Sequence, residues 1–109
     1  MKRSPEIFIA HIAKNITVIE TKTKGKTWLD FYKDPDLQDI VIRRLQVIGE
    51  AGQNLEEHFK KRYPNIPWKQ MWALRNILIH EYFGIDLKAV WKVVKKDIPK
   101  LKKEISKIK

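Results

Sequence analysis

The chain has 109 residues, of which 43% are hydrophobic and 33% are charged. This length fits one domain spanning residues 1–109, and the apolar content supports one modest core and excludes a disordered chain. The apolar runs are far shorter than the roughly 20 residues of a membrane-spanning helix. The lack of cysteine excludes disulfides and thiolate chemistry. Because the N-terminus has no signal-peptide pattern, we expect a cytoplasmic protein with no membrane partner.

The net charge of +10 is concentrated towards the C-terminal end of the sequence. Residues 88–109 carry nine lysines against Asp97 and Glu104, a net charge of +7. A basic stretch of this kind favours polyanionic partners and is the electrostatic pattern expected of a nucleic-acid-binding surface. A solvated helix face from a lysine-rich proteome is the alternative interpretation.

The first helix is predicted from its start signal. Ser4-Pro5 combines a capping hydroxyl with proline at the first helical position. Apolar residues then recur at spacings of three and four, which predicts an amphipathic helix to about Glu20. Residues 21–27 are polar and form a connection, and residues 28–32 make a short apolar patch of one helical turn.

A second long helix is predicted between Asp34-Pro35 and Tyr63-Pro64. Gly49 and Gly52 lie inside this pattern, and each glycine costs about 1 kcal/mol relative to alanine in a helix interior. We explain them by the close approach of another helix, either from this chain or from a second copy.

Two further helices complete the chain. One opens after Asn65-Ile66-Pro67 and is expected to end near Gly84, a plausible C-cap. Asp86 caps the last helix, and Pro99 is expected to kink or split that helix near Asp97. Since no segment alternates with period two, the sequence predicts an all-α fold, an antiparallel bundle of four main helices.

Most familiar catalytic arrangements are missing from this sequence. The three histidines lack metal-ligand spacing and no Glu-x-x-His pair occurs, so we expect no metal. Gly49-Glu50-Ala51-Gly52 lacks the following Lys-Ser/Thr of a phosphate loop. The only serines, Ser4 and Ser106, lie near the ends of the chain and give no support for a serine triad.

One stretch places Arg75, Asn76, His80 and Tyr82 within eight residues among apolar neighbours. His80 can move a proton near neutral pH, Arg75 can clamp a phosphate, and Asn76 can orient either one. Together they could drive attack of an RNA 2′-hydroxyl on its own phosphate. On an ideal helix His80 lies about 140° from Arg75, so the pair converges only at a helix end or across two subunits.

A structural interpretation of the same stretch stays open. His80 near a helix C-terminus can interact favourably with the negative end of the helix dipole. Arg75 can form a buried ion pair with Glu50 or Asp86, and Tyr82 can belong to the core.

The motif resembles a known family. Arg75-Asn76-x-x-x-His80-x-Tyr82 is similar to the Arg-(polar)-x-x-x-His motif of HEPN domains, and the trailing tyrosine resembles the HepT branch, the toxin of HepT/MNT toxin–antitoxin pairs. Other segments resemble this family in order along the chain: Val47–Ala51, Arg62–Trp68, Tyr82–Asp86 and Val90-Trp91. The similarity covers roughly residues 4–105.

The resemblance implies a HEPN-like bundle that forms a homodimer, in which two motif helices face each other and build a composite cleft. It implies a metal-independent endoribonuclease without cofactor that acts on cellular RNA (tRNA or mRNA), with Arg75 and His80 as the catalytic pair and Asn76 in support. Tyr82 matches the tyrosine that the family's nucleotidyltransferase antitoxin modifies with AMP, so ATP is that antitoxin's substrate. The lysine-rich last helix then gains a role as an RNA- or antitoxin-contacting surface.

Two alternatives to the ribonuclease remain open at this point. Some HEPN proteins are non-catalytic subunits that bind a nucleotide or RNA, and in such a protein Arg75 would grip a phosphate of the ligand. A purely structural partner of a nucleotidyltransferase is the other alternative.

Overall fold

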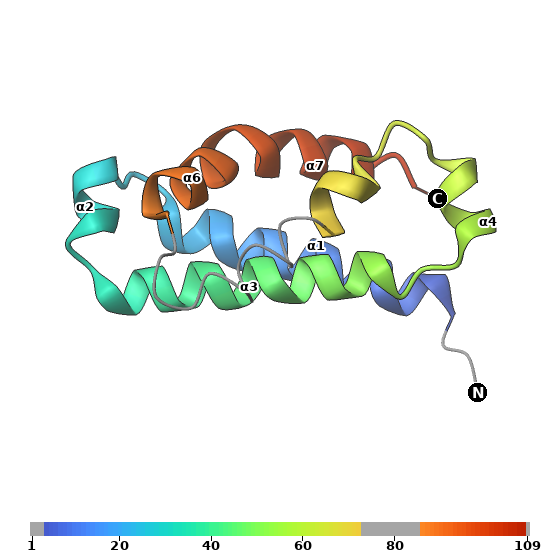
Figure 1. Ribbon diagram of the computed structural model, residues 1–109, viewed down its shortest axis with the longest axis horizontal. Coiled ribbons are helices and arrows are strands. Elements are labelled where there is room, and N and C mark those ends of the chain that lie inside the picture. The colour runs from blue at the N-terminus through green and yellow to red at the C-terminus, as the bar shows by residue number, and fades with distance from the viewer. Residues whose placement is uncertain (1–3, 73–85, 109) are drawn as a thin grey trace.

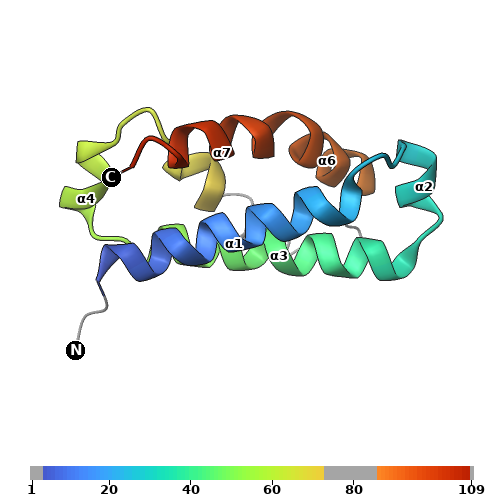
Figure 2. The same cartoon turned by 180° about the vertical axis from the view of Figure 1, so that it is seen from behind.

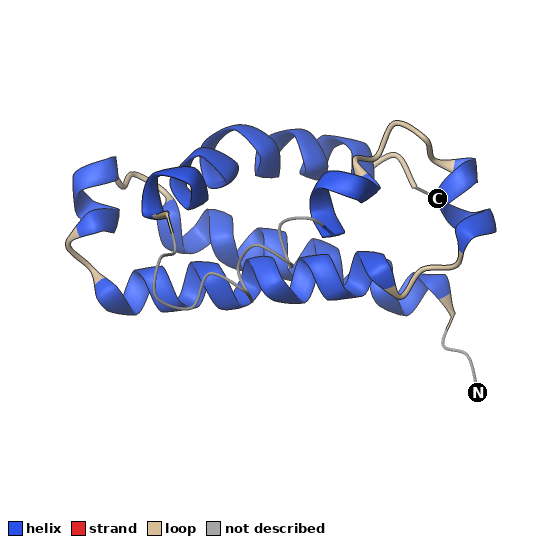
Figure 3. Cartoon of the chain, viewed as in Figure 1, coloured by secondary structure: helices blue, strands red, loops and turns tan. Residues whose placement is uncertain are grey.

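A computed structural model describes residues 4–72 and 86–108 of the chain (Figure 1). Helices joined by short loops account for these residues, and there is no strand among them (Figure 3). The all-α prediction is therefore confirmed. The described elements are α1 (Pro5–Thr23), α2 (Trp28–Tyr32), α3 (Pro35–Gln53), α4 (Glu57–Arg62), a helical segment at residues 68–72, α6 (Leu87–Lys92), the π-helical turn η1 (Val93–Asp97) and α7 (Ile98–Ile105).

Three long helical elements enclose the core. α1 and α3 run antiparallel and pack along their lengths, and α6, η1 and α7 form a continuous rod that runs lengthwise beside them, with α7 against α1 and α6 against α2 (Figures 1 and 2). Each element contributes apolar side chains at spacings of three and four. The fully or almost fully buried members include Ile12, Ile16, Ile19, Phe31, Val41, Leu45, Ile48 and Ile98. Burial of this apolar surface is the main favourable contribution to folding.

Aspartate side chains cap two helices where the sequence predicts a start. The Asp34 Oδ1 accepts a hydrogen bond from the Leu37 N–H at 3.1 Å. The Asp86 Oδ1 accepts from the N–H groups of Lys88 and Ala89, at 3.0 and 3.2 Å. These bonds satisfy backbone donors that have no partner inside the helix.

The short helix α2 closes one end of the bundle. A capping box starts it, because the Thr27 N–H donates to the Asp30 carboxylate at 2.8 Å and the Asp30 N–H donates to the Thr27 hydroxyl at 3.1 Å. The backbone bond from Thr27 holds the pKa of Asp30 below its usual value. The ring of Phe31 stacks on Trp91 at 4.9 Å between centroids, which joins α2 to α6.

A buried amide links α1 to α3. The Asn15 side chain donates to the His11 carbonyl at 2.7 Å, and its oxygen accepts from the Arg44 guanidinium at 3.1 Å. α1 also runs three residues beyond its predicted end at Glu20, as far as Thr23. Thr23 is buried and its hydroxyl donates to the Ile19 carbonyl at 2.7 Å. The added turn therefore places Thr23 on the side of the helix that faces the core.

The prediction of one continuous helix from Pro35 to Tyr63 is wrong. α3 ends at Gln53 and α4 begins at Glu57. At the break, the backbone N–H and the side-chain amide of Asn54 both donate to the Glu50 carbonyl, at 3.1 and 2.9 Å. Asparagine side chains compete with the helical ladder in this way, and the neighbouring Gly52 weakens it further.

The last helix is interrupted in front of Pro99, as predicted. The Ile98 N–H donates to the Val93 carbonyl, five residues earlier, which defines the wide turn η1. Proline has no N–H and its ring crowds the preceding turn, so regular α-helical bonding cannot pass through this point. The helix continues as α7 from Ile98 with its buried face intact.

Gly52 is buried where a side chain of another helical segment lies against α3. A Cβ placed on Gly52 would lie 2.5 Å from the Met71 Sδ. The predicted close approach is therefore made by the Met71 side chain. Met71 is itself buried and belongs to the segment at residues 68–72. The absence of a side chain at Gly52 therefore lets this segment pack against α3.

We expect Gly52→Val to lower the free energy of unfolding by about 1–3 kcal/mol, because the added methyl groups overlap the Met71 thioether. Thermal and denaturant unfolding monitored by circular dichroism measure the effect. In the double variant Gly52→Val/Met71→Ala the two losses should not add, since the second change frees the space that the first one needs. Additive losses, or an unchanged melting temperature for Gly52→Val, would contradict the close approach.

Candidate active site

The four residues of the predicted site, Arg75, Asn76, His80 and Tyr82, lie outside the described residues, as does Gly84. The catalytic assignments and the alternative ion pair of Arg75 therefore stay predictions. The structure describes the residues on both sides of the motif, which are the segment at residues 68–72 before it and the start of α6 at Asp86 after it.

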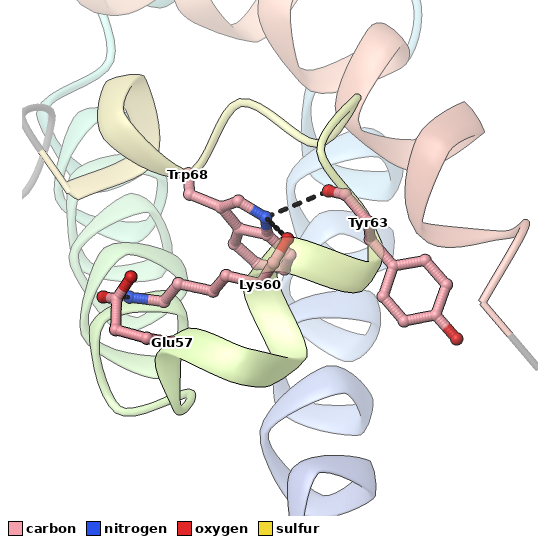
Figure 4. Close-up of polar contacts among 4 residues, drawn as sticks. All are labelled: Glu57, Lys60, Tyr63 and Trp68. Carbon is pink, nitrogen blue, oxygen red and sulfur yellow. Dashed lines mark hydrogen bonds and ion pairs between the residues drawn. The ribbon is translucent and has the colours of Figure 1, made fainter.

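Trp68 ties the segment before the motif to the end of α4. Its indole N–H donates to the carbonyls of Lys60 and Tyr63, at 3.2 and 3.1 Å (Figure 4). Both acceptors are in the last turn and cap of α4, and each also accepts a backbone bond, from the Tyr63 N–H to Lys60 at 3.1 Å and from the Ile66 N–H to Tyr63 at 3.2 Å. The indole is thus a second donor to each carbonyl, and these two bonds fix its own ring. With Met71 against Gly52, the segment is held to both α3 and α4.

On the other side of the motif, Asp86 is engaged in capping. The two N–H groups of α6 that donate to its Oδ1 belong to the first turn of the helix. This carboxylate therefore has a structural role in the described part of the chain, independent of any contact with Arg75.

A groove lies beside the segment that leads into the motif. It has a volume of about 450 Å³ and is lined by Glu57, Lys60, Lys61, Pro64, Trp68, Lys69 and Trp72. Trp72 is 43% exposed, which is high for so large an apolar side chain. Three lysines stand against one glutamate in this lining, so the groove carries positive charge next to two indole rings.

This groove is not predicted by the apolar spacing of the sequence. Trp68 and Trp72 are apolar positions of the predicted third helix, and spacing alone does not distinguish a buried ring from an exposed one. The available signal was the set of lysines at positions 60, 61 and 69 around these aromatic residues.

The groove is joined to the predicted catalytic arginine by a short length of chain. Arg75 follows Trp72 by three residues. Three peptide units span at most about 11 Å between Cα atoms, because consecutive Cα atoms are 3.8 Å apart. Covalent connectivity therefore keeps the groove and Arg75 within one small region of the protein.

Part of the basic charge on the last helix has structural partners. The Lys102 ammonium lies 2.9 Å from the Glu20 carboxylate of α1, and the Lys95 ammonium lies over the Trp91 ring, 4.7 Å from its centroid. The contact with Glu20 is a surface ion pair worth at most about 1 kcal/mol. Other lysines of this helix, including Lys96 and Lys100, are exposed.

No three His, Asp or Glu side chains gather to hold a metal ion within residues 4–72 and 86–108. His80 and Glu81 are not among those residues, so the expectation of a metal-free site stays a prediction. In the same part of the chain, no helix is long and apolar enough to cross a membrane.

Comparisons with known proteins identify the family. The family model described as "Ribonuclease HepT-like" matches residues 12–108. A "Probable ribonuclease HepT" of Thermococcus cleftensis is 44% identical over 109 residues, which is all of this chain and 99% of that protein. A "Gamma-glutamylcyclotransferase and putative RNase" of Methanocaldococcus jannaschii is 52% identical over 108 residues, but the chain spans only 49% of its length. No solved structure matches the chain. The chain belongs to the HepT-like ribonuclease family.

Proposed function

We propose that this protein is the ribonuclease toxin of a HepT/MNT-type toxin–antitoxin pair. It cleaves cellular RNA (tRNA or mRNA) without a metal ion. We place this reaction in the cytoplasm. Arg75 and His80 form the catalytic pair and Asn76 supports them. The observation that carries the proposal is the family match across residues 12–108, a range that contains the whole Arg75-to-Tyr82 motif with its charged and titratable residues intact.

The chemistry follows from the residue types. The ribose 2′-oxygen attacks the adjacent phosphorus, forming a new P–O bond while the bond to the 5′-oxygen breaks. The products are a 2′,3′-cyclic phosphate and a 5′-hydroxyl. His80 accepts the proton of the 2′-hydroxyl, and a proton passes to the leaving 5′-oxygen to give the 5′-hydroxyl. Arg75 stabilises the charge on the phosphate through paired N–H donors.

A homodimer is part of the proposal, because one helix does not bring Arg75 and His80 together. His80 lies five positions after Arg75, which corresponds to about 140° around an α-helix. Two motif helices that face each other would supply Arg75 from one protomer and His80 from its partner.

We expect His80→Ala to reduce cleavage of total RNA in EDTA at least about a hundredfold, because proton transfer by a positioned imidazole is worth that much or more. Arg75→Ala should reduce cleavage by a similar factor, because the charge on the phosphate is then no longer stabilised. Gel analysis of RNA incubated with purified protein measures both.

His11→Ala is the matched control, since His11 is exposed on α1. It should cleave like the wild type. Size-exclusion chromatography and circular dichroism on the same samples establish that each variant is a folded dimer. Full activity of a folded His80→Ala dimer would remove His80 from the mechanism. A folded wild-type dimer that cleaves nothing would favour the non-catalytic HEPN subunit instead.

We further propose that the nucleotidyltransferase antitoxin transfers AMP to Tyr82. The modification would add a negatively charged phosphate two residues from His80, which blocks the site and repels RNA. In this step the Tyr82 hydroxyl oxygen attacks the α-phosphorus of ATP, the bond between the α- and β-phosphates breaks, and pyrophosphate leaves, so ATP is consumed by the antitoxin.

Tyr82→Phe should abolish labelling by radioactive ATP and the cognate antitoxin, because the acceptor hydroxyl is gone while the ring remains. The chain has three tyrosines, so Tyr32→Phe and Tyr63→Phe are matched controls that should still be labelled. Autoradiography of the separated proteins is the measurement. Labelling that persists in Tyr82→Phe and disappears in either control would reassign the acceptor.

A further inference from the structure

We propose that the groove between α4 and the segment at residues 68–72 binds single-stranded RNA. Bases stack on the indole rings of Trp68 and Trp72, and the backbone phosphates contact Lys60, Lys61 and Lys69. The inference deepens the proposed ribonuclease function and rests on it for the choice of RNA as the ligand.

The aromatic lining supplies the stacking surface. Trp72 is 43% exposed, so a large apolar ring faces water in the free protein. Trp68 is half-buried and its ring cannot turn freely, because its N–H is committed to the carbonyls of Lys60 and Tyr63 (Figure 4). One fixed ring and one exposed ring in the same groove match the stacking platforms that bind unpaired bases.

The charged lining supplies contacts to the phosphates. Lys61 and Lys69 are exposed. The Lys60 ammonium lies 3.7 Å from the Glu57 carboxylate, and the Lys60 side chain is only 18% exposed. This contact is long, and Glu57 is itself 81% exposed, so a phosphate can take its place without leaving a buried charge unpaired. Complementary charge therefore favours a polyanion in this groove.

The position in the sequence connects the groove to the reaction. The chain from Trp72 to Arg75 reaches at most about 11 Å. A strand of RNA that stacks on Trp72 thus lies close enough for the same molecule to enter the catalytic region. Stacking also selects the form of the substrate, since bases inside a duplex do not expose their faces.

Fluorescence anisotropy of a labelled single-stranded RNA tests the groove directly. Methylation of every ribose 2′-oxygen in the probe removes the attacking group, so binding is measured without cleavage. We expect Trp72→Ala to weaken binding about tenfold, the loss typical of one stacked base. Trp72→Phe keeps an aromatic face and should retain most of the affinity, even if Trp72→Ala proves poorly folded.

The lysines are tested by salt dependence. Lys61→Glu/Lys69→Glu should lower the slope of log affinity against log salt by roughly 1.4, since each phosphate contact to a single strand contributes about 0.7. The matched controls are Lys22→Glu/Lys33→Glu, which changes the net charge equally at exposed positions elsewhere, and Tyr32→Ala, which removes another exposed ring. Both controls should bind like the wild type, and an unlabelled RNA duplex should compete poorly.

Failure of this inference can be separated from failure of the proposed function. If Trp72→Ala and the lysine pair bind RNA within about twofold of their controls while the wild type still cleaves RNA, the groove is not an RNA site and a protein partner becomes its occupant. A duplex that competes as well as the single strand would also overturn the inference. If the groove variants lose binding but wild-type protein never cleaves RNA, the inference stands and the ribonuclease proposal falls.

Discussion

The position of the segment that leads into the motif depends on two side-chain contacts. Gly52 leaves room for the Met71 thioether against α3, where a Cβ would lie 2.5 Å from the Met71 Sδ and require that side chain to move. The Trp68 indole N–H then bonds to two carbonyls at the end of α4. Close packing and directional hydrogen bonds, rather than charge, therefore determine where the chain is positioned three residues before Arg75. A site that depends on geometry benefits from this kind of rigid support.

The basic residues of the protein fall into two groups with different surroundings. On the last helix, Lys102 pairs with Glu20 of α1, and Lys95 covers the Trp91 ring one turn earlier on the same helical rod, so part of the charge has partners within the fold. Around the groove, Lys61 and Lys69 are exposed beside indole rings. Charge alone attracts any polyanion, whereas charge next to flat apolar surface favours unpaired nucleic acid. The proposed RNA site therefore rests on the smaller cluster of lysines next to Trp72 and not on the C-terminal excess of lysine.

Sequence patterns predicted the helices well where start signals are local. Proline at the first helical position and the aspartate caps at Asp34 and Asp86 indicate helix starts through bonds within one turn. The break at Asn54 was missed because the apolar spacing continues through Leu55 and Phe59, both buried, while the interruption comes from a side-chain amide that competes with the backbone.

The candidate site was predictable only in part, since the Arg75-to-Tyr82 motif is a contiguous pattern, whereas the groove joins residues from α4 and from residues 68–72. Which face of Trp72 meets solvent depends on how these two segments pack, and helical spacing carries no such information.

The wide turn η1 also affects how relatives are compared. Its closing bond spans five residues, from Ile98 to Val93, and so it holds one residue more than an ordinary helical turn. Two homologous chains can therefore differ in length by one residue here while the flanking helices keep their places on α1 and α2. A one-residue difference in length between two such chains fits within Val93–Asp97. In that case the lysines before and after this turn take different offsets from their equivalents in the other sequence.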